Sequence, residues 1–343
     1  MSEPIAPSPQ RRLSFQTIQT ASVFLLLVGL CVVSSLRTDT FFTWGNLVDN
    51  LLTNAAYLGV IACGMTFVMV AGGFDLSVAS ITATCSVVTV LTLQRFVGSG
   101  PWIAIPAAIV ATALAGTVLG TANGALIAYV GVNPFVVTLS TMLVFRGLAL
   151  VTTHGGQTIE VPPALRSTIR QFYWGHVNLF GEAHHVTIPI LVFVLVFIVF
   201  YCILRFTRYG HYVYAVGGNE TASWLAGVNT AAVKMITYTL SGFTCAIAAL
   251  IYTGMSNTAQ AASYQGLEMV VIASVIVGGT PLGGGQGGLF YTLIGLLLLS
   301  VIENLLTQFG VTEEFRNIVR GSIILVVVAI DVTVRRRAAR GKA

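Results

Sequence analysis

Long apolar stretches recur along nearly the whole chain, and their length limits its possible folds more than any other feature. A helix needs about 20 apolar residues to cross the hydrocarbon core of a membrane. Backbone groups in lipid must be hydrogen-bonded internally, which continuous runs achieve as helices. The sequence therefore predicts an all-α integral membrane protein with about ten transmembrane helices in one bundle. The predicted spans are 19–36, 48–70, 76–94, 102–130, 134–153, 187–204, 231–254, 266–280, 285–308 and 315–334.

Composition excludes a water-soluble globule. Hydrophobic residues make up 55% of the 343 residues and charged residues 8%, whereas soluble domains carry about 25% charged residues. The five cysteines lie in apolar runs without a C-x-x-C pair, so neither a disulfide framework nor a metal site is predicted. A basic face with interleaved aromatic residues is also missing from the sequence, which argues against a nucleic-acid partner.

The placement of Lys and Arg predicts the orientation of the chain. Loops on the cytoplasmic side of membrane proteins carry an excess of these residues. With the N-terminus inside, the inner segments hold ten of them and the outer segments five. The inner ones are Arg11, Arg12, Arg205, Arg208, Lys234, Arg335, Arg336, Arg337, Arg340 and Lys342, and the outer ones are Arg37, Arg95, Arg166, Arg170 and Arg316. We therefore expect a disordered cytoplasmic tail over 1–18, a transmembrane domain over 19–334 and a basic cytoplasmic tail over 335–343.

The long inner loop 205–230 contains a pattern typical of a short helix. A glycine pair breaks the chain, an asparagine suits the N-cap, and an acidic residue follows where the helix dipole favours negative charge. A large apolar side chain then precedes a glycine that suits the C-terminal stop. The pattern indicates either a helix that docks on a soluble partner or a connector with no partner. The residues concerned are Gly217, Gly218, Asn219, Glu220, Trp224 and Gly227.

Four segments, in order along the chain, resemble the membrane permeases of bacterial monosaccharide ABC importers, the ribose, xylose, arabinose and galactofuranose group. Residues 64–80 resemble the family's G-M-T-x-V-x-x-x-G-G-I-D-L-S-V-G-S, in which Gly72, Gly73, Asp75 and Ser77 are matched. Residues 134–147 resemble P-x-F-x-x-T-L-x-x-x-x-x-R-G, with an N-G-x-L segment before them that begins at Asn123. Residues 214–219 resemble Y-A-x-G-G-N, and residues 268–280 resemble E-x-D-x-I-A-x-V-x-x-G-G-T.

The chain departs from these patterns at two positions. Ala79 stands where the family usually has glycine. Val270 stands where an aspartate is common, which leaves Glu268 as the acidic residue of its segment.

The resemblance implies a larger machine in a bacterial inner membrane. Two permeases, identical or related, would pair in the lipid bilayer. Cytoplasmic ATPase subunits would carry ATP and Mg, and an extracytoplasmic binding protein would deliver the sugar. The segment from Asn219 to Val228 would be the coupling helix. The chain itself would bind no cofactor and catalyse no reaction, which agrees with the missing G-x-x-x-x-G-K-[ST] motif and with a glycine-rich 278–288 segment that has no lysine.

Polar residues within the spans are candidates for the transport path, because charges in a membrane usually face protein or a cavity. Asn50 and Asn54 share a helix face, as do Asn304 and Gln308. The predicted path residues are Asn54, Asn123, Arg146, Glu268 and Asn304.

Structural roles compete with functional ones for two side chains, Arg146 of the path set and Asp75 of the 64–80 segment. Arg146 could instead brace the bundle by pairing with Glu268 or Glu303. Asp75 fits the N-cap of a helix that begins at Leu76 better than a ligand contact.

Other functions stay open on the sequence alone. Branched-chain amino acid and nucleoside ABC permeases share this general build. A proton-coupled secondary transporter would need carboxylates near the midplane in matched helices, and Glu303 is the one expected deep in a span. The motifs do not separate pentoses, hexoses and polyols.

Overall fold

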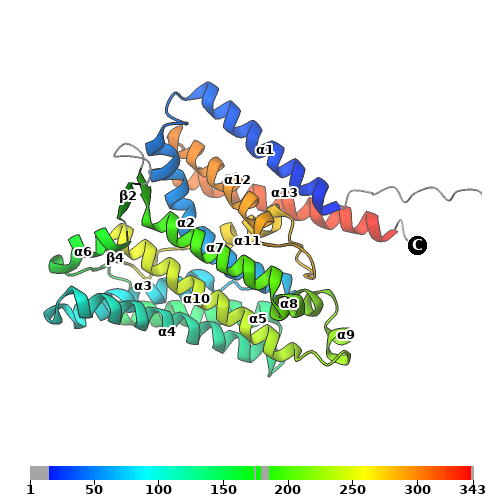
Figure 1. Ribbon diagram of the computed structural model, residues 1–343, viewed down its shortest axis with the longest axis horizontal. Coiled ribbons are helices and arrows are strands. Elements are labelled where there is room, and N and C mark those ends of the chain that lie inside the picture. Colours follow the sequence, from blue (N-terminus) through cyan, green and yellow to red (C-terminus); the bar gives the residue numbers. More distant parts are fainter. Residues whose placement is uncertain (1–14, 174, 179–184, 341–343) are drawn as a thin grey trace, which may run out of the picture.

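The computed structural model describes residues 15–173, 175–178 and 185–340, and each of the ten predicted spans is helical in it (Figure 1). The helices are α1 (Phe15–Arg37), α2 (Thr53–Val70), α3 (Val78–Arg95), α4 (Pro101–Ala128), α5 (Pro134–Thr152), α7 (Ile188–Phe206), α10 (Thr230–Ser256), α11 (Leu267–Gly278), α12 (Leu289–Gln308) and α13 (Glu313–Arg340). A π-helical segment, η1 (Gly45–Leu52), leads directly into α2. The prediction of an all-α membrane protein is therefore confirmed.

Short elements connect the long helices. They are η2 (Val97–Ser99), β1 (Ile159–Glu160), α6 (Pro163–Tyr173), β2 (His176–Asn178), β3 (His185–Thr187), α8 (Arg208–Gly218), α9 (Glu220–Leu225) and β4 (Thr258–Ala259). Strand β1 pairs antiparallel with β4, and β2 pairs antiparallel with β3. The segment between α5 and α7 thus contains a helix and parts of two small sheets.

Several boundaries differ from the predicted ones. Helix α1 already begins at Phe15, and α13 continues to Arg340, so the basic segment 335–340 extends a helix. Residues 1–14 and 341–343 lie outside the described part of the chain. Helix α11 has 12 residues, about 18 Å at 1.5 Å per residue, which is too short to cross a bilayer alone. Among the described residues, seven helices are long and apolar enough to cross.

Burial divides the bundle into inner and outer helices. In the most apolar window of each helix, 78% of residues are buried in η1–α2, but only 22% in α5 and in α7. The outward faces of α4, α5 and α7 present large apolar side chains such as Leu114, Leu143 and Leu195. A chain that exposes such faces on several sides needs lipid or a protein partner around it.

Glycines bring α4 and α10 into backbone contact. A Cβ on Gly120 would lie 2.3 Å from the carbonyl oxygen of Tyr238, and one on Gly116 would lie 2.4 Å from that of Gly242. Small residues at helix interfaces permit such close approach in membranes, where packing rather than the hydrophobic effect drives association. This contact packs α4 closely against α10.

The two ends of the bundle have different structures. Figure 1 shows α8 and α9 at the end where α1 begins and α13 ends, while α6 and β2 lie at the opposite end. Helix α2 connects the two ends, because it follows η1 near β3 and terminates beside α8.

Candidate functional site

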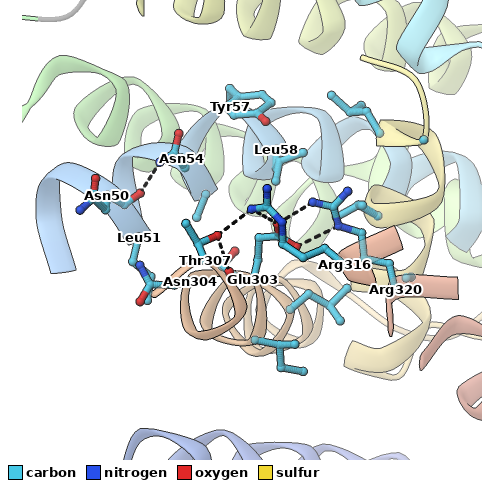
Figure 2. Close-up of a pocket in the computed structure, with 18 of the residues that line it drawn as sticks. Asn50, Leu51, Asn54, Tyr57, Leu58, Glu303, Asn304, Thr307, Arg316 and Arg320 are labelled. Atoms are coloured by element: carbon cyan, nitrogen blue, oxygen red, sulfur yellow. Dashed lines mark hydrogen bonds and ion pairs between the residues drawn. The ribbon is translucent and has the colours of Figure 1, made fainter. Parts of the chain in front are cut away.

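A cavity of about 720 Å³ lies between η1, α2, α11, α12 and α13 (Figure 2). Its η1 end contacts β3, at the end of the bundle opposite α8 and α9 (Figure 1). We call it the polar cavity. Its polar lining consists mainly of amides, tyrosines and charged groups, and apolar side chains such as Leu58 and Val270 line the rest. The amides are Asn46, Asn50, Asn54, Gln265, Asn304 and Gln308, the tyrosines are Tyr57, Tyr252 and Tyr264, and the charged residues are Glu303, Glu313, Arg316 and Arg320.

The amides are positioned by helical periodicity and by bonds between helices. Asn54 Nδ2 donates to the carbonyl oxygen of Asn50 one turn earlier, at 2.7 Å. Asn46 and Asn304 donate to each other's Oδ1, at 3.2 and 2.9 Å, and thereby join η1 to α12. Gln308 Nε2 donates to Asn304 Oδ1 at 2.9 Å. The prediction that Asn50 shares a face with Asn54, and Asn304 with Gln308, is confirmed.

Three tyrosines form an aromatic row along one wall of the polar cavity. The ring centroids of Tyr57 and Tyr252 are 5.5 Å apart with the rings near perpendicular. Those of Tyr252 and Tyr264 are 4.8 Å apart. Edge-to-face packing of this kind stabilises the rings beyond area burial. The row combines an apolar surface with hydroxyl groups.

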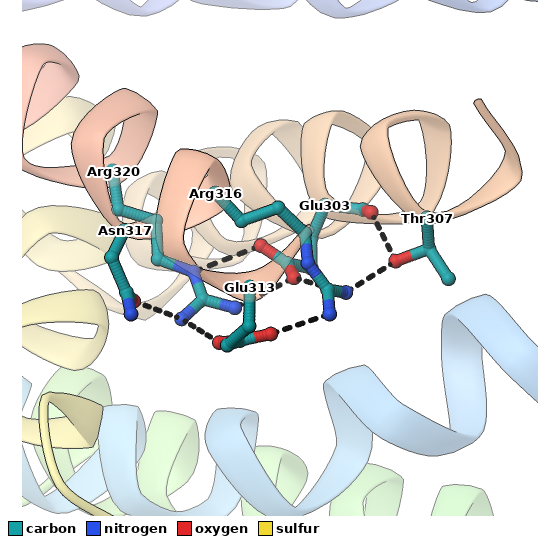
Figure 3. A network of polar contacts seen from close by, with 6 residues as sticks. All are labelled: Glu303, Thr307, Glu313, Arg316, Asn317 and Arg320. Atoms are coloured by element: carbon teal, nitrogen blue, oxygen red, sulfur yellow. Dashed lines mark hydrogen bonds and ion pairs between the residues drawn. The ribbon is translucent and has the colours of Figure 1, made fainter. Parts of the chain in front are cut away.

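The charged residues form one network between α12 and α13 (Figure 3). Glu303 Oε1 lies 3.1 Å from Arg316 Nη1 and 2.6 Å from Arg320 Nη2. Glu313 pairs with the same two arginines, at 2.5 and 3.1 Å. Arg316 Nη1 also donates to Thr307 Oγ1 at 2.7 Å. Two carboxylates and two guanidinium groups therefore balance each other.

The position of Glu303 and the contacts of Arg146 differ from what the sequence led us to expect of charges in the spans. Glu303 lies five residues before the end of α12, about 8 Å along the axis, so it is not deep in a span. Arg146 forms no ion pair with Glu268 or Glu303 among the contacts of the described residues, although it interacts electrostatically with Glu268. Arg146 Nη1 and Glu268 Oε2 are both buried, and neither has a hydrogen-bond partner within the described part of the chain. Neither residue lines the polar cavity.

Asn123 also lies away from the polar cavity, in a buried cluster around the turn between α2 and α3. Asp75 Oδ1 accepts from the backbone N–H and hydroxyl of Ser77, at 2.9 and 2.6 Å, and its Oδ2 accepts from Ser241 Oγ at 3.0 Å. Asn123 Nδ2 donates to Ser77 Oγ at 2.8 Å. The helix begins at Val78 rather than at Leu76. Asp75 thus ties the turn to α10 instead of capping a helix that starts directly after it.

The predicted short helix is present as α9, at the end of the bundle opposite the polar cavity. Asn219 Oδ1 accepts from the N–H of Ala222 at 2.9 Å, as an N-cap does. Gly227 ends the segment with φ +84°, and Glu220 pairs with Lys234 at 2.5 Å. Trp224 is 65% exposed. The helix, its cap and its stop agree with the predictions.

The glycine pair before α9 has a different role from the predicted one. Gly217 and Gly218 end α8, and the chain breaks at Asn219, where φ is −161°. A Cβ on Gly217 would lie 1.8 Å from the carbonyl oxygen of Val70. Gly285 N–H donates to that same oxygen at 2.8 Å. The backbones of α2, α8 and the 279–288 turn therefore meet at one joint, and Gly72 lies within it.

Sequence reasoning missed several lining residues of the polar cavity. Arg316 belongs to a short predicted loop, and Tyr57 and Tyr252 look like ordinary apolar positions. Glu303 and Arg320, both in predicted spans, gave a signal, because opposite charges in apolar helices often pair. Of the predicted path residues, Asn54 and Asn304 lie together at the cavity, and Asn123, Arg146 and Glu268 do not.

Known proteins are similar in sequence to this chain over nearly its whole length. The ribose import permease of Bacillus subtilis (strain 168) is 36% identical over 94% of this chain and 96% of its own length. The ribose import permease of Escherichia coli (strain K12) is 34% identical, covering 92% and 94% of the two chains, and that organism's L-arabinose transport system permease is 32% identical, covering 94% of each. No solved structure gives a significant match. The profile described as "Branched-chain amino acid transport system / permease component" matches residues 47–328, and the chain therefore belongs to that permease family.

Proposed function

We propose that this chain is the membrane permease of an ATP-binding-cassette importer that moves a monosaccharide into the cytoplasm. Relatives that are 36% and 32% identical to this chain are named as ribose and arabinose permeases. The observation that carries the proposal is the exposed, capped helix α9 at the opposite end of the bundle from a cavity lined with amides and tyrosines. ATP hydrolysis occurs on a separate subunit, and a binding protein supplies the sugar on the other side.

The ATPase docks on α9 and the adjacent α8. Trp224 and Leu225 are 65% and 73% exposed, and an apolar pair on a short helix is the kind of anchor that fits a groove on a soluble partner. The joint of α8 with Val70 offers a direct route from this surface to α2. The end that carries α9 is then cytoplasmic, together with both termini, and the membrane is the bacterial inner membrane.

A branched-chain amino acid is the second candidate substrate, because the family description names that class. A zwitterion is bound best where the site offers partners for both of its charges, such as free charged side chains or helix ends. The four charged side chains at the polar cavity already pair with one another, which favours the sugar.

ATP-dependent uptake tests the proposal. The chain is reconstituted in proteoliposomes with its ATPase and binding-protein partners, and uptake of radiolabelled D-ribose and L-arabinose is measured with and without ATP. We expect ATP-dependent uptake, and we expect Trp224→Ala to lower it at least tenfold through loss of a central apolar anchor.

Trp102→Ala is the matched control, since Trp102 is 86% exposed on α4. This variant retains uptake and ATPase binding. Uptake by the permease without an ATPase would contradict the proposal and would point to a secondary transporter.

A further inference from the structure

We propose that the polar cavity is a binding site within the permease for one neutral monosaccharide, and that its paired charges exclude sugar acids and sugar phosphates. This inference rests on the proposed function and assigns the substrate a specific place on its path. Four features of the polar cavity support this inference: its unpartnered polar atoms, its balanced charges, its row of tyrosines and its position in the bundle.

Three lining side chains carry buried polar atoms that have no hydrogen-bond partner among the described residues. Arg316 Nε is a donor, Gln308 Oε1 is an acceptor, and the hydroxyl of Tyr264 can be either. A buried polar group left unpaired costs about 1–3 kcal/mol. A sugar hydroxyl both donates and accepts hydrogen bonds, so a polyhydroxylated ligand can satisfy a donor and an acceptor in the same cavity.

The charges at the cavity select for a ligand without net charge. Glu303 and Glu313 each contact both Arg316 and Arg320, so two negative and two positive groups neutralise one another. An added carboxylate or phosphate would find no free cation in this set and would lose its hydration, which is costly away from water. A neutral sugar has no charge whose hydration is lost. The carboxylate of Glu303 can still accept a hydrogen bond from a sugar hydroxyl.

The opposite wall complements the apolar side of a sugar ring. The C–H groups of a pyranose or furanose are weakly positive, and the face of a tyrosine ring is negative. Tyr57 and Tyr252 provide such faces, and Asn54 stands one turn before Tyr57 on the same helix. Figure 2 shows Tyr57 and Asn54 on α2 across from the charged network. The cavity volume of about 720 Å³ lies within the range of about 300–1,000 Å³ for small-molecule sites.

The position of the cavity suits a step early in import. It lies at the start of α2, and α2 terminates at Val70, where the α8 joint begins. One buried helix therefore links a ligand at Asn54 with the surface where the ATPase docks.

Binding to the purified full-length chain in lipid nanodiscs tests the inference. The probes are radiolabelled D-ribose, L-arabinose, D-xylose and D-galactose, with D-ribonate and D-ribose 5-phosphate as competitors. We expect saturable binding of at least one neutral sugar that other neutral sugars displace and the two anions do not. Asn54→Leu and Tyr57→Leu each raise the dissociation constant about tenfold, a typical loss for one good contact.

Two further variants sharpen the test. Tyr129→Leu removes an exposed tyrosine of the loop after α4 and leaves binding unchanged. Glu303→Gln leaves one cation unbalanced, so D-ribonate becomes a competitor. Thermal unfolding of each variant shows that it is folded, and the competition by anions on the unsubstituted chain needs no variant at all.

Three outcomes overturn the inference: binding that is equal in Asn54→Leu and Tyr57→Leu, displacement by the anions from the unsubstituted chain, or no binding of any neutral sugar. Each of them leaves the proposed function standing if the reconstituted complex still takes up sugar with ATP. Conversely, the proposed function fails if the complex shows no ATP-dependent sugar uptake, whatever the isolated chain binds.

Discussion

Asp75 carries a fully buried carboxyl group, and the hydrogen bonds that it accepts from the described residues come from neutral groups. Ser77 supplies two and Ser241 supplies one. Burial raises the pKa of this carboxyl, while the hydrogen bonds from Ser77 and Ser241 act in the opposite direction. The residue lies in the turn between α2 and α3, so its protonation state affects how that turn holds to α10.

The raised pKa of Asp75 predicts a pH-dependent stability. The folded chain keeps the proton to a higher pH than the unfolded chain does, so the stabilisation is complete below the ordinary pKa and is lost as pH rises through the raised one. Within that window the free energy of unfolding falls as the pH rises. Chemical denaturation in detergent over a series of pH values measures this slope.

Asp75→Asn removes this contribution and keeps a side chain of the same shape. Asp39→Asn, at an exposed loop position, is the matched control and retains the slope. If the Asp75→Asn chain has the same slope as the unsubstituted chain, Asp75 does not cause the pH dependence. Its carboxyl group would then ionise equally readily in the folded and the unfolded chain.

For single residues, spacing along the sequence predicts which side chains share a helix face. Asn50 and Asn54, or Asn304 and Gln308, are four apart, and the helical period alone places each pair on one face. That Asn46 of η1 would bond Asn304 of α12 could not be predicted. The packing of the two helices depends on side chains separated by more than 200 positions in the sequence.

At the scale of elements, the joint between α2 and α8 offers a test with a matched pair of glycines. A Cβ on Gly217 would overlap the backbone of Val70, whereas one on Gly218 would meet nothing within 4 Å. Overpacking of this kind costs about 1–3 kcal/mol when the backbone shifts to relieve it.

Gly217→Ala is therefore expected to displace α8 from α2, to lower the melting temperature and to reduce ATP-driven uptake. Gly218→Ala, one residue further along the same helix end, leaves both quantities unchanged. Circular dichroism during heating and the proteoliposome assay check these results. Equal behaviour of the two variants would argue against a tight joint.

Elements with local signals were predicted well. The asparagine cap and the glycine stop define α9, because both act within one turn of the helix. Helix α8 was not predicted, since its glycine pair resembles a break. The structure uses those glycines for contact with Val70 and with the 279–288 turn, a requirement that arises only when three distant segments meet.

At the scale of the whole molecule, the orientation of the bundle has a direct test. If the end with α9 is cytoplasmic, Trp224→Cys reacts with a membrane-impermeant maleimide only after the cells are permeabilised. Gln171→Cys, on the exposed part of α6 at the opposite end, reacts in intact cells. A chain with the five native cysteines serves as the background control, and the reverse labelling pattern would overturn the orientation.

The amino-acid sequence is sufficient to predict that this chain crosses a membrane as a helical bundle, because crossing depends on the length and polarity of single segments. It is also sufficient to predict the short capped helix α9, because capping is local. Which polar residues meet is known from the packed bundle alone: Asn54 and Asn304 share a cavity, Glu303 pairs with Arg316 and Arg320, and Arg146 and Glu268 lie elsewhere. Contacts of this kind depend on how whole helix faces pack, and that packing involves many side chains at once.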